Sequence, residues 1–177
     1  MVTLVRGGAE RGDGYIAAFR SVQRCLYLMH IDDDPPGAEL LALYRVLLDR
    51  GVQIRRLVMV REDASVSAYR WIADFGDHPN LQHAVVFAER AALLHMGFVL
   101  VDGRVVLLSV PGHEAIDGKP YSDRLVLRHL LRIDDAEVAA AFLRIHEDLW
   151  ARARLLASAS ELPALLGKSR RVFSADG

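Results

Sequence analysis

Residues 95–110, which read HMGFVLVDGRVVLLSV, carry the strongest structural signal in this sequence. Two apolar runs, Phe98–Val101 and Arg104–Val110, are joined across the dipeptide Asp102-Gly103. Apolar runs joined by Asp-Gly are typical of a β-hairpin, because these residues accept the positive φ angles that a tight hairpin turn requires. The stretch therefore predicts two antiparallel strands connected by a two-residue turn.

The sequence before this hairpin alternates between helical and strand periodicity. Helical spacing of apolar residues predicts helices over residues 13–24, 37–50 and 64–75, and short apolar runs predict buried strands over residues 25–29, 52–60 and 81–87. Asp13 is the predicted N-cap of the first helix, and Gly51 is the predicted C-cap glycine of the second. Because these helices lie between strands, we expect parallel crossover connections.

The sequence after the hairpin predicts one more strand and a long helix. The strand covers Leu125–Ile133, and Asp134 or Asp135 caps the helix that follows. One face of this helix is apolar and can serve the core or an interface; its members are Val138, Phe142, Ile145, Leu149 and Trp150. The predicted order is α-β-α-β-α-β-β-β-β-α, an α/β fold whose mixed β-sheet has helices on both faces. We expect a single domain over residues 1–177, with a core over about 10–158 and a loose C-terminal tail over 159–177.

The composition is that of an ordinary globular protein and excludes several classes. The chain has 177 residues, of which 52% are hydrophobic and 25% are charged, and its formal net charge is −1. The apolar runs are too short to span a bilayer, and the first residues lack the apolar core of a signal peptide. The single cysteine, Cys25, cannot form an internal disulfide, so we expect a cytoplasmic location. Near-zero net charge argues against a generic basic nucleic-acid binder but is compatible with a local arginine patch.

His95 and Asp102 have the spacing of a known motif, with Gly97 between them. The segment resembles the phospholipase D superfamily motif, in which His-x-Lys is followed by four residues and Asp. Residues 50–58 resemble the second strand of such domains and residues 132–142 their closing strand and helix, so the resemblance covers most of residues 10–155. It implies a phospholipase D-like fold, a homodimer whose two motifs share one cleft, and a nucleophilic histidine at His95. It calls for no metal and no cofactor.

The sequence departs from the motif at the residues that bind phosphate. The lysine position is Gly97, the family's Gly-Ser pair is replaced by Ser109-Val110, and its Asn position is Gly112. Glycine cannot supply a cation, and loss of one transition-state donor costs about 10²–10³ in rate. Ser109, or His113 and Lys119 in the loop over residues 111–121, can provide replacement groups.

These departures favour binding over catalysis. We predict a non-catalytic, phospholipase D-like module that binds a phosphate-bearing ligand, a membrane headgroup or a protein partner, with Gly97, Ser109, His113 and Lys119 as ligand-binding residues. The alternative is a phosphodiesterase that acts through a phosphohistidine at His95 in a homodimer. In that enzyme Asp102 belongs to the catalytic motif, and His113 can complete an acid–base pair with His95. A third alternative leaves the resemblance aside and treats the chain as an α/β protein that acts in a complex.

The remaining histidines do not predict a metal site. His30 and Asp32–Asp34 follow the first strand and can hold Mg²⁺ or Ca²⁺, but we favour a solvated loop that caps the next helix. His78 and His83 flank a turn, and because zinc needs three or four ligands we expect them to be surface loop histidines.

Cys25 and two arginines complete the candidates. Cys25 opens a buried strand, and we expect it to be a packed thiol rather than a nucleophile. Arg55 and Arg56 lie on opposite faces of one strand, so at least one of them is expected to meet a covered surface and pair with an acid.

Overall fold

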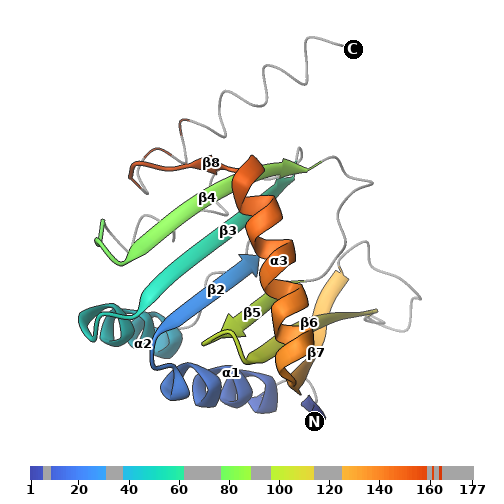
Figure 1. The fold of residues 1–177 in the computed structure, drawn as a ribbon. Coiled ribbons are helices and arrows are strands. Elements are labelled where there is room, and N and C mark those ends of the chain that lie inside the picture. Colours follow the sequence, from blue (N-terminus) through green and yellow to red (C-terminus); the bar gives the residue numbers. More distant parts are fainter. Residues whose placement is uncertain are drawn as a thin grey trace, which may run out of the picture.

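The structure of the chain is a computed structural model, shown as a ribbon in Figure 1. It describes residues 1–5, 9–30, 38–61, 77–88, 97–113, 125–158, 161 and 164. The predicted helix over residues 64–75 lies outside these ranges.

The described residues form one eight-stranded sheet. In chain order its strands are β1 (Val2–Val5), β2 (Cys25–His30), β3 (Gln53–Arg61), β4 (Leu81–Ala88), β5 (Phe98–Val101), β6 (Val105–His113), β7 (Leu125–Asp134) and β8 (Arg154–Leu155). The helices are α1 (Ala9–Ser21), α2 (Ala38–Asp49) and α3 (Ala136–Arg152). Across the sheet the strands lie in the order β1-β7-β6-β5-β2-β3-β4-β8.

The predicted mixed sheet is confirmed. β2, β3 and β4 are parallel neighbours, and the other neighbouring pairs are antiparallel. α2 connects the parallel strands β2 and β3, as the periodicity predicts, and Gly51 ends this connection with a φ of 84°. The hairpin between β5 and β6 is also present, with φ angles of 50° at Asp102 and 68° at Gly103.

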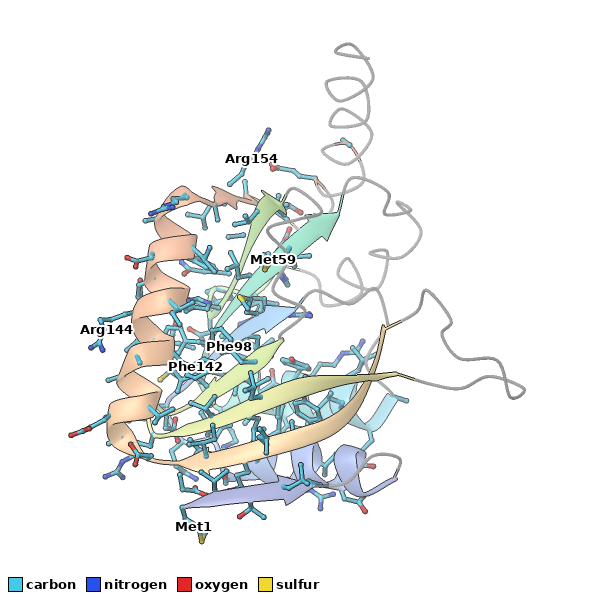
Figure 2. All side chains as sticks on the ribbon, turned by 90° about the vertical axis from the view of Figure 1, so that its right-hand side faces the viewer. Met1, Met59, Phe98, Phe142, Arg144 and Arg154 are labelled. Carbon is cyan, nitrogen blue, oxygen red and sulfur yellow. The ribbon has the colours of Figure 1, made fainter. Side chains whose placement is uncertain are left out.

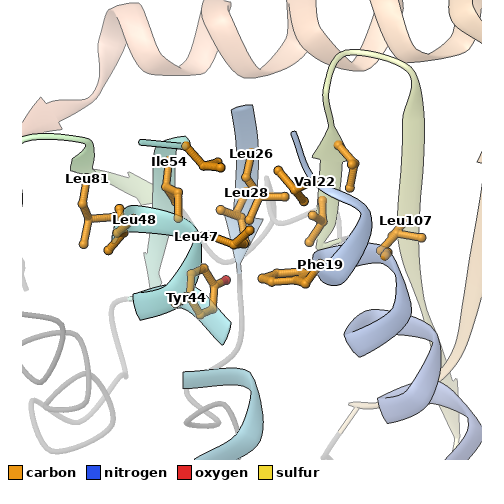
Figure 3. Close-up of a cluster of buried hydrophobic side chains, with 14 of the residues drawn as sticks. Phe19, Val22, Leu26, Leu28, Tyr44, Leu47, Leu48, Ile54, Leu81 and Leu107 are labelled. Carbon is orange, nitrogen blue, oxygen red and sulfur yellow. The ribbon is translucent and has the colours of Figure 1, made fainter. Parts of the chain in front are cut away.

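Helices cover both faces of the sheet, and each face has its own apolar core. Because side chains alternate along a strand, Leu26 and Leu28 of β2 pack toward α1 and α2, whereas Tyr27 and Met29 pack toward α3. Figure 3 shows the first core, in which the ring of Phe19 from α1 meets the ring of Tyr44 from α2 edge to face. The two centroids are 5.0 Å apart.

The second core lies beneath α3, which crosses the sheet diagonally (Figures 1 and 2). Phe142 of α3 contacts Phe98 of β5 with the ring centroids 5.0 Å apart. Asp135 begins the helix as its N-cap, since its carboxylate accepts hydrogen bonds from the N–H groups of Glu137 and Val138. Most of the predicted apolar stripe packs on this core, but Ile145 is 46% exposed and does not.

The first helix begins earlier than its sequence predicts, and the prediction of Asp13 as its N-cap is wrong. α1 starts at Ala9, so Asp13 lies in its second turn. Gly12 and Gly14 lie in this part of the helix, and glycine disfavours helical structure. A Cβ atom at Gly14 would lie 3.2 Å from Leu130 Cδ2, so a larger residue here would require the Leu130 side chain to shift by a few tenths of an ångström.

The flanking strands β1 and β8 were not predicted. They contain four and two residues, respectively, and such short segments show no readable periodicity. Both are edge strands, because β1 pairs with β7 and β8 pairs with β4 at opposite ends of the sheet order.

Candidate functional site

The structure describes part of the predicted site. Gly97, Asp102 and Ser109 are described in full, whereas His95 and Lys119 lie outside the described residues. His113 is described only through its backbone, which pairs with Leu125 at the end of β6. The roles assigned to His95, His113 and Lys119 therefore stay predictions.

Gly97 and Ser109 are neighbours at one end of the sheet. The backbone N–H of Ser109 donates a hydrogen bond of 2.8 Å to the carbonyl oxygen of Gly97. Gly97 immediately precedes β5, and the first residue of β5, Phe98, pairs with Met29 near the carboxyl end of β2. Ligands of open α/β sheets bind at the carboxyl ends of parallel strands, so this position suits a ligand site.

The backbone packs tightly at Gly97. A Cβ atom at this residue would lie 3.2 Å from the carbonyl oxygen of Met29, which is closer than most real Cβ contacts. Any side chain here requires a backbone shift of a few tenths of an ångström. The position that holds a lysine in the phospholipase D motif is therefore occupied by a close approach between two strands, and its nearest neighbour is the negative end of a carbonyl dipole.

Ser109 is buried and already has a partner. Its side chain is 3% exposed, and its hydroxyl shares a hydrogen bond of 2.5 Å with the hydroxyl of Tyr15 from α1. Sequence reasoning placed Tyr15 only on an apolar helix stripe and did not connect it with Ser109. The signal that could have found it is the phenol itself, because a buried tyrosine hydroxyl usually needs a hydrogen-bond partner.

Asp102 lies at the opposite end of β5 from Gly97, about 16 Å away at 3.3 Å per residue. Its carboxylate accepts hydrogen bonds of 2.8–3.0 Å from the backbone N–H groups of three consecutive residues, Gln23, Arg24 and Cys25. Burial acts to raise the pKa of Asp102, but these hydrogen bonds and the Arg24 charge outweigh it and lower the pKa below 3.8. These hydrogen bonds connect the hairpin turn with the start of β2.

A second polar group is buried beneath α2. Arg56 of β3 is 1% exposed, and its guanidinium lies 5.5 Å from the centre of the Tyr44 ring. Burial lowers the pKa of Arg56. The neighbouring residue in β4 is His83.

The prediction of His83 as a surface loop histidine is wrong. His83 is 5% exposed and lies within β4, on the face where Leu81 and Val85 are also buried. Burial and the charge of Arg56 lower the pKa of His83 to about 3, so the ring is neutral near pH 7. The sequence signal was misread because His78 and His83 were treated as one turn, whereas strand alternation places His83 inside.

Arg55 faces α3 and is the arginine that pairs with an acid, whereas the fully covered arginine is Arg56, so the two properties that were predicted for one residue are divided between both. The Arg55 guanidinium forms a 3.1 Å ion pair with Glu147 and stacks over the rings of Tyr27 and Trp150 at 5.9 and 5.5 Å. Cys25 lies on the same face at intermediate exposure, and burial raises the pKa of its thiol.

Two hollows of the described surface are not lined by Gly97. One of about 360 Å³ is lined by residues around the start of β4 and the segment after β8, among them His78, His83 and Ser158. Another of about 230 Å³ is lined by Cys25, Tyr27, Gln53, Arg55 and Gln82. Within the described ranges, no three His, Cys, Asp or Glu side chains gather in a way that could hold a metal ion, and none of the described helices is long and apolar enough to cross a bilayer.

Comparisons at the sequence level return nothing, because no protein-family model and no curated protein matches the chain. Solved structures do match. Nuc from Salmonella typhimurium, a phospholipase D family member, superposes with a TM-score of 0.62 at 13% identity, over 88% of this chain and 99% of its own. This chain has a phospholipase D-like fold. The predicted fold class and resemblance are thereby confirmed at the level of the fold.

Other solved structures with this phospholipase D-like fold differ in how much of their length it occupies. NucT from Helicobacter pylori matches with a TM-score of 0.63 at 12% identity, over 87% of this chain and 98% of NucT. TrmBL2, an archaeal chromatin protein with a novel mode of DNA binding, matches with a TM-score of 0.59 at 17% identity, over 86% of this chain. The chain spans 53% of the length of TrmBL2.

Proposed function

We propose that this phospholipase D-like chain is a module that binds a phosphate-bearing ligand without hydrolysing it. The observation that carries the proposal is Gly97, whose Cβ position lies 3.2 Å from the carbonyl oxygen of Met29. A catalytic site for phosphoryl transfer needs a cation where charge develops on the phosphate oxygens, and a lost donor costs about 10²–10³ in rate. At residue 97 the chain has a backbone contact in place of that cation.

The state of Ser109 supports the same conclusion. Its hydroxyl, one of the predicted replacement donors, is hydrogen bonded to Tyr15 and almost fully buried. His113 and Lys119 remain the predicted groups that contact a ligand. Because phosphate binding requires fewer aligned donors than phosphoryl transfer, a site with this composition is better suited to binding than to turnover.

DNA is the first phosphate-bearing ligand to test, because TrmBL2 is a DNA-binding protein and has the same fold over about half its length. The net charge of −1 predicts that few phosphates are contacted. Binding should therefore show a shallow salt dependence, since each neutralised phosphate contributes about 0.9 to the slope of log K against log salt. A membrane headgroup is the second candidate, tested with vesicles that contain phosphatidylserine.

The binding experiment is a fluorescence anisotropy titration of duplex DNA, run beside a vesicle flotation assay at the same salt concentrations. We expect His95→Ala and His113→Ala to weaken binding of whichever ligand is retained. The matched control is Arg144→Ala, which removes an exposed cation from the outer side of α3 (Figure 2). If all three variants bind equally, or if neither ligand binds at low salt, the binding proposal is wrong.

The alternative is a phosphodiesterase that acts through His95 in a homodimer, and activity on bis(4-nitrophenyl) phosphate separates the two. The binding proposal predicts the same background rate for the wild-type protein and His95→Ala. A rate that disappears in His95→Ala would instead establish the enzyme. Gly97→Lys tests whether only the cation is missing, and Gly97→Ala is its control because it adds the same Cβ atom without the charge.

A further inference from the structure

The smaller of the two hollows lies on the α3 face of the sheet, where the parallel strands β2, β3 and β4 begin (Figure 1). This β2–β4 hollow has a volume of about 230 Å³ and is lined by Cys25, Tyr27, Gln53, Arg55 and Gln82. In the register of the strands, Arg55 lies between Tyr27 and Gln82, and Cys25 is the neighbour of Gln53. Because alternate residues of a strand point to the same face, these five side chains gather on one surface.

The charges around the β2–β4 hollow are balanced. The guanidinium of Arg55 forms a 3.1 Å ion pair with Glu147 of α3. Two further charges, those of Asp102 and Arg24, act on the Cys25 thiol with opposite signs. Since each cation has an acidic neighbour, the hollow offers little net attraction to an anion. A ligand that fits it is uncharged and is recognised through hydrogen bonds and packing.

The two glutamines present one hydrogen-bond acceptor and one donor. Gln53 donates from its side-chain nitrogen to Asn80 Oδ1 at 2.7 Å, and Gln82 accepts with its side-chain oxygen from Arg55 Nε at 3.2 Å. Among the described residues, these bonds leave the side-chain oxygen of Gln53 and the side-chain amide nitrogen of Gln82 for a ligand. The ring of Tyr27 adds an aromatic wall, and the guanidinium of Arg55 lies 5.9 Å from its centre.

We propose that the β2–β4 hollow binds a single nucleobase that presents a donor beside an acceptor. Adenine has such an edge, because its N7 accepts and its 6-amino group donates. The amide of Gln82 donates to N7, the 6-amino group donates to the side-chain oxygen of Gln53, and the base packs against Tyr27. Aromatic rings and guanidinium planes are common partners of unstacked bases in proteins. The volume equals that of about seven to eight water molecules at ~30 Å³ each, which suits one base and not a base pair.

This site is separate from the one in the proposed function. Gly97 contacts Met29 near the carboxyl end of β2, about 13 Å along the strand from Cys25 at 3.3 Å per residue. None of the residues that line the β2–β4 hollow is a predicted phosphate-binding residue. Loss of one site should therefore leave the other intact.

Cys25 provides a reporter of occupancy, because it is the only cysteine of the chain and lines the hollow at intermediate exposure. The rate of its alkylation by iodoacetamide is measured on the full chain at mildly alkaline pH, with and without adenosine, and calorimetry gives the dissociation constant. We expect adenosine to slow alkylation and ribose to have no effect. Purine riboside lacks the 6-amino group and should bind about two- to tenfold more weakly, which is the effect of one lost hydrogen bond.

Gln82→Glu tests the donor without removing the support of Arg55. The carboxylate still accepts from Arg55 Nε, but it places an acceptor opposite the N7 acceptor of adenine, so adenosine should bind about tenfold more weakly or worse. Gln23→Glu is the matched control, since it adds the same charge at an exposed residue that precedes Cys25 and does not line the hollow. It should bind adenosine as the wild type does, and circular dichroism should show that both variants are folded.

A single-stranded oligodeoxyadenylate and a duplex of the same length identify the source of the base. Protection of Cys25 by the single strand indicates a base within nucleic acid, and protection by adenosine alone indicates a free nucleoside. The proposal is wrong if neither slows alkylation, if ribose or the duplex protects equally well, or if Gln82→Glu binds adenosine as the wild type does. These outcomes are read separately from duplex binding by His95→Ala and His113→Ala, which tests the proposed function.

Discussion

At the scale of single residues, Asp102 accepts hydrogen bonds from three backbone N–H groups, so its role in stability can be tested by substitution. We expect Asp102→Ala to lower the free energy of unfolding by about 1–2 kcal/mol, at the low end for a charged acceptor because the carboxylate is partly exposed. Asp102→Asn keeps one acceptor oxygen and should lower the free energy of unfolding by about half as much. Urea unfolding at neutral pH measures both.

The pH dependence of this difference has a definite sign. The pKa of Asp102 is lower in the folded chain than its ordinary 3.8, so its charged form stabilises the fold above that value. As the pH falls below 3.8 and through the folded pKa, this contribution is lost. The stability gap between wild type and Asp102→Asn should therefore narrow in acid. A gap that stays constant would show that the carboxylate charge plays no part.

Two buried histidines predict a second acid sensitivity at higher pH. Burial and Arg56 lower the pKa of His83 to about 3. His146 is a buried residue of α3, and burial and the charge of Arg55 lower its pKa to about 4. A hydrogen bond with the backbone of Leu28 has a smaller effect in the opposite direction. Both rings protonate near 6.5 in the unfolded chain, so stability should be complete above pH 6.5 and fall below it. Each histidine contributes up to about 1.4 kcal/mol per pH unit to the decrease in the free energy of unfolding.

Urea unfolding at several pH values between 6.5 and 4 measures this slope. Because His83→Gln and His146→Gln can each change stability through packing, the slope rather than the absolute value is compared. Each variant should reduce the slope, and the double variant should reduce it further. Equal slopes in wild type and the double variant would contradict the assignment.

At the scale of the elements, the N-terminus of α3 offers a clean test of local sequence rules. Asp135 was one of two predicted caps, and its carboxylate accepts from the N–H groups of Glu137 and Val138 at 3.0 and 3.1 Å. Asp135→Ala should lower the free energy of unfolding by about 1 kcal/mol, whereas Asp135→Asn should be nearly neutral. Asp148→Ala, an exposed substitution of the same kind on the same helix, is the control and should stay within about 0.5 kcal/mol.

Elements with local signals could be predicted, and elements that depend on distant contacts could not. The Asp102-Gly103 turn, the Gly51 end of α2 and the Asp135 cap each follow from residues within a few positions. β1 exists because β7, more than a hundred residues away, provides its partner. The contact of Gly14 in α1 with Leu130 of β7 likewise joins residues that are far apart in the sequence.

The candidate site divides in the same way. The spacing of His95, Gly97 and Asp102, taken together with residues 50–58 and 132–142, suggested the fold type, which Nuc and NucT then confirmed. Spacing could not show that Ser109 is paired with Tyr15, because these residues are 94 positions apart and on different elements. It also could not show the Met29 carbonyl beside Gly97, since that contact arises between two strands of the sheet.

At the scale of the whole molecule, the two cores divide the sheet into a stable centre and labile edges. β2 contributes to both cores, and Leu26 and Leu28 are fully buried. β1 and β8 each have one neighbour, and most of their side chains are exposed. Amide exchange reports the free energy of local opening, which follows the number of buried contacts that must break.

Amide hydrogen exchange read residue by residue should therefore be slowest in β2, β3 and β5 and fastest in β1 and β8. Uniform exchange across the sheet would contradict the prediction that the central strands are more stable than the edge strands.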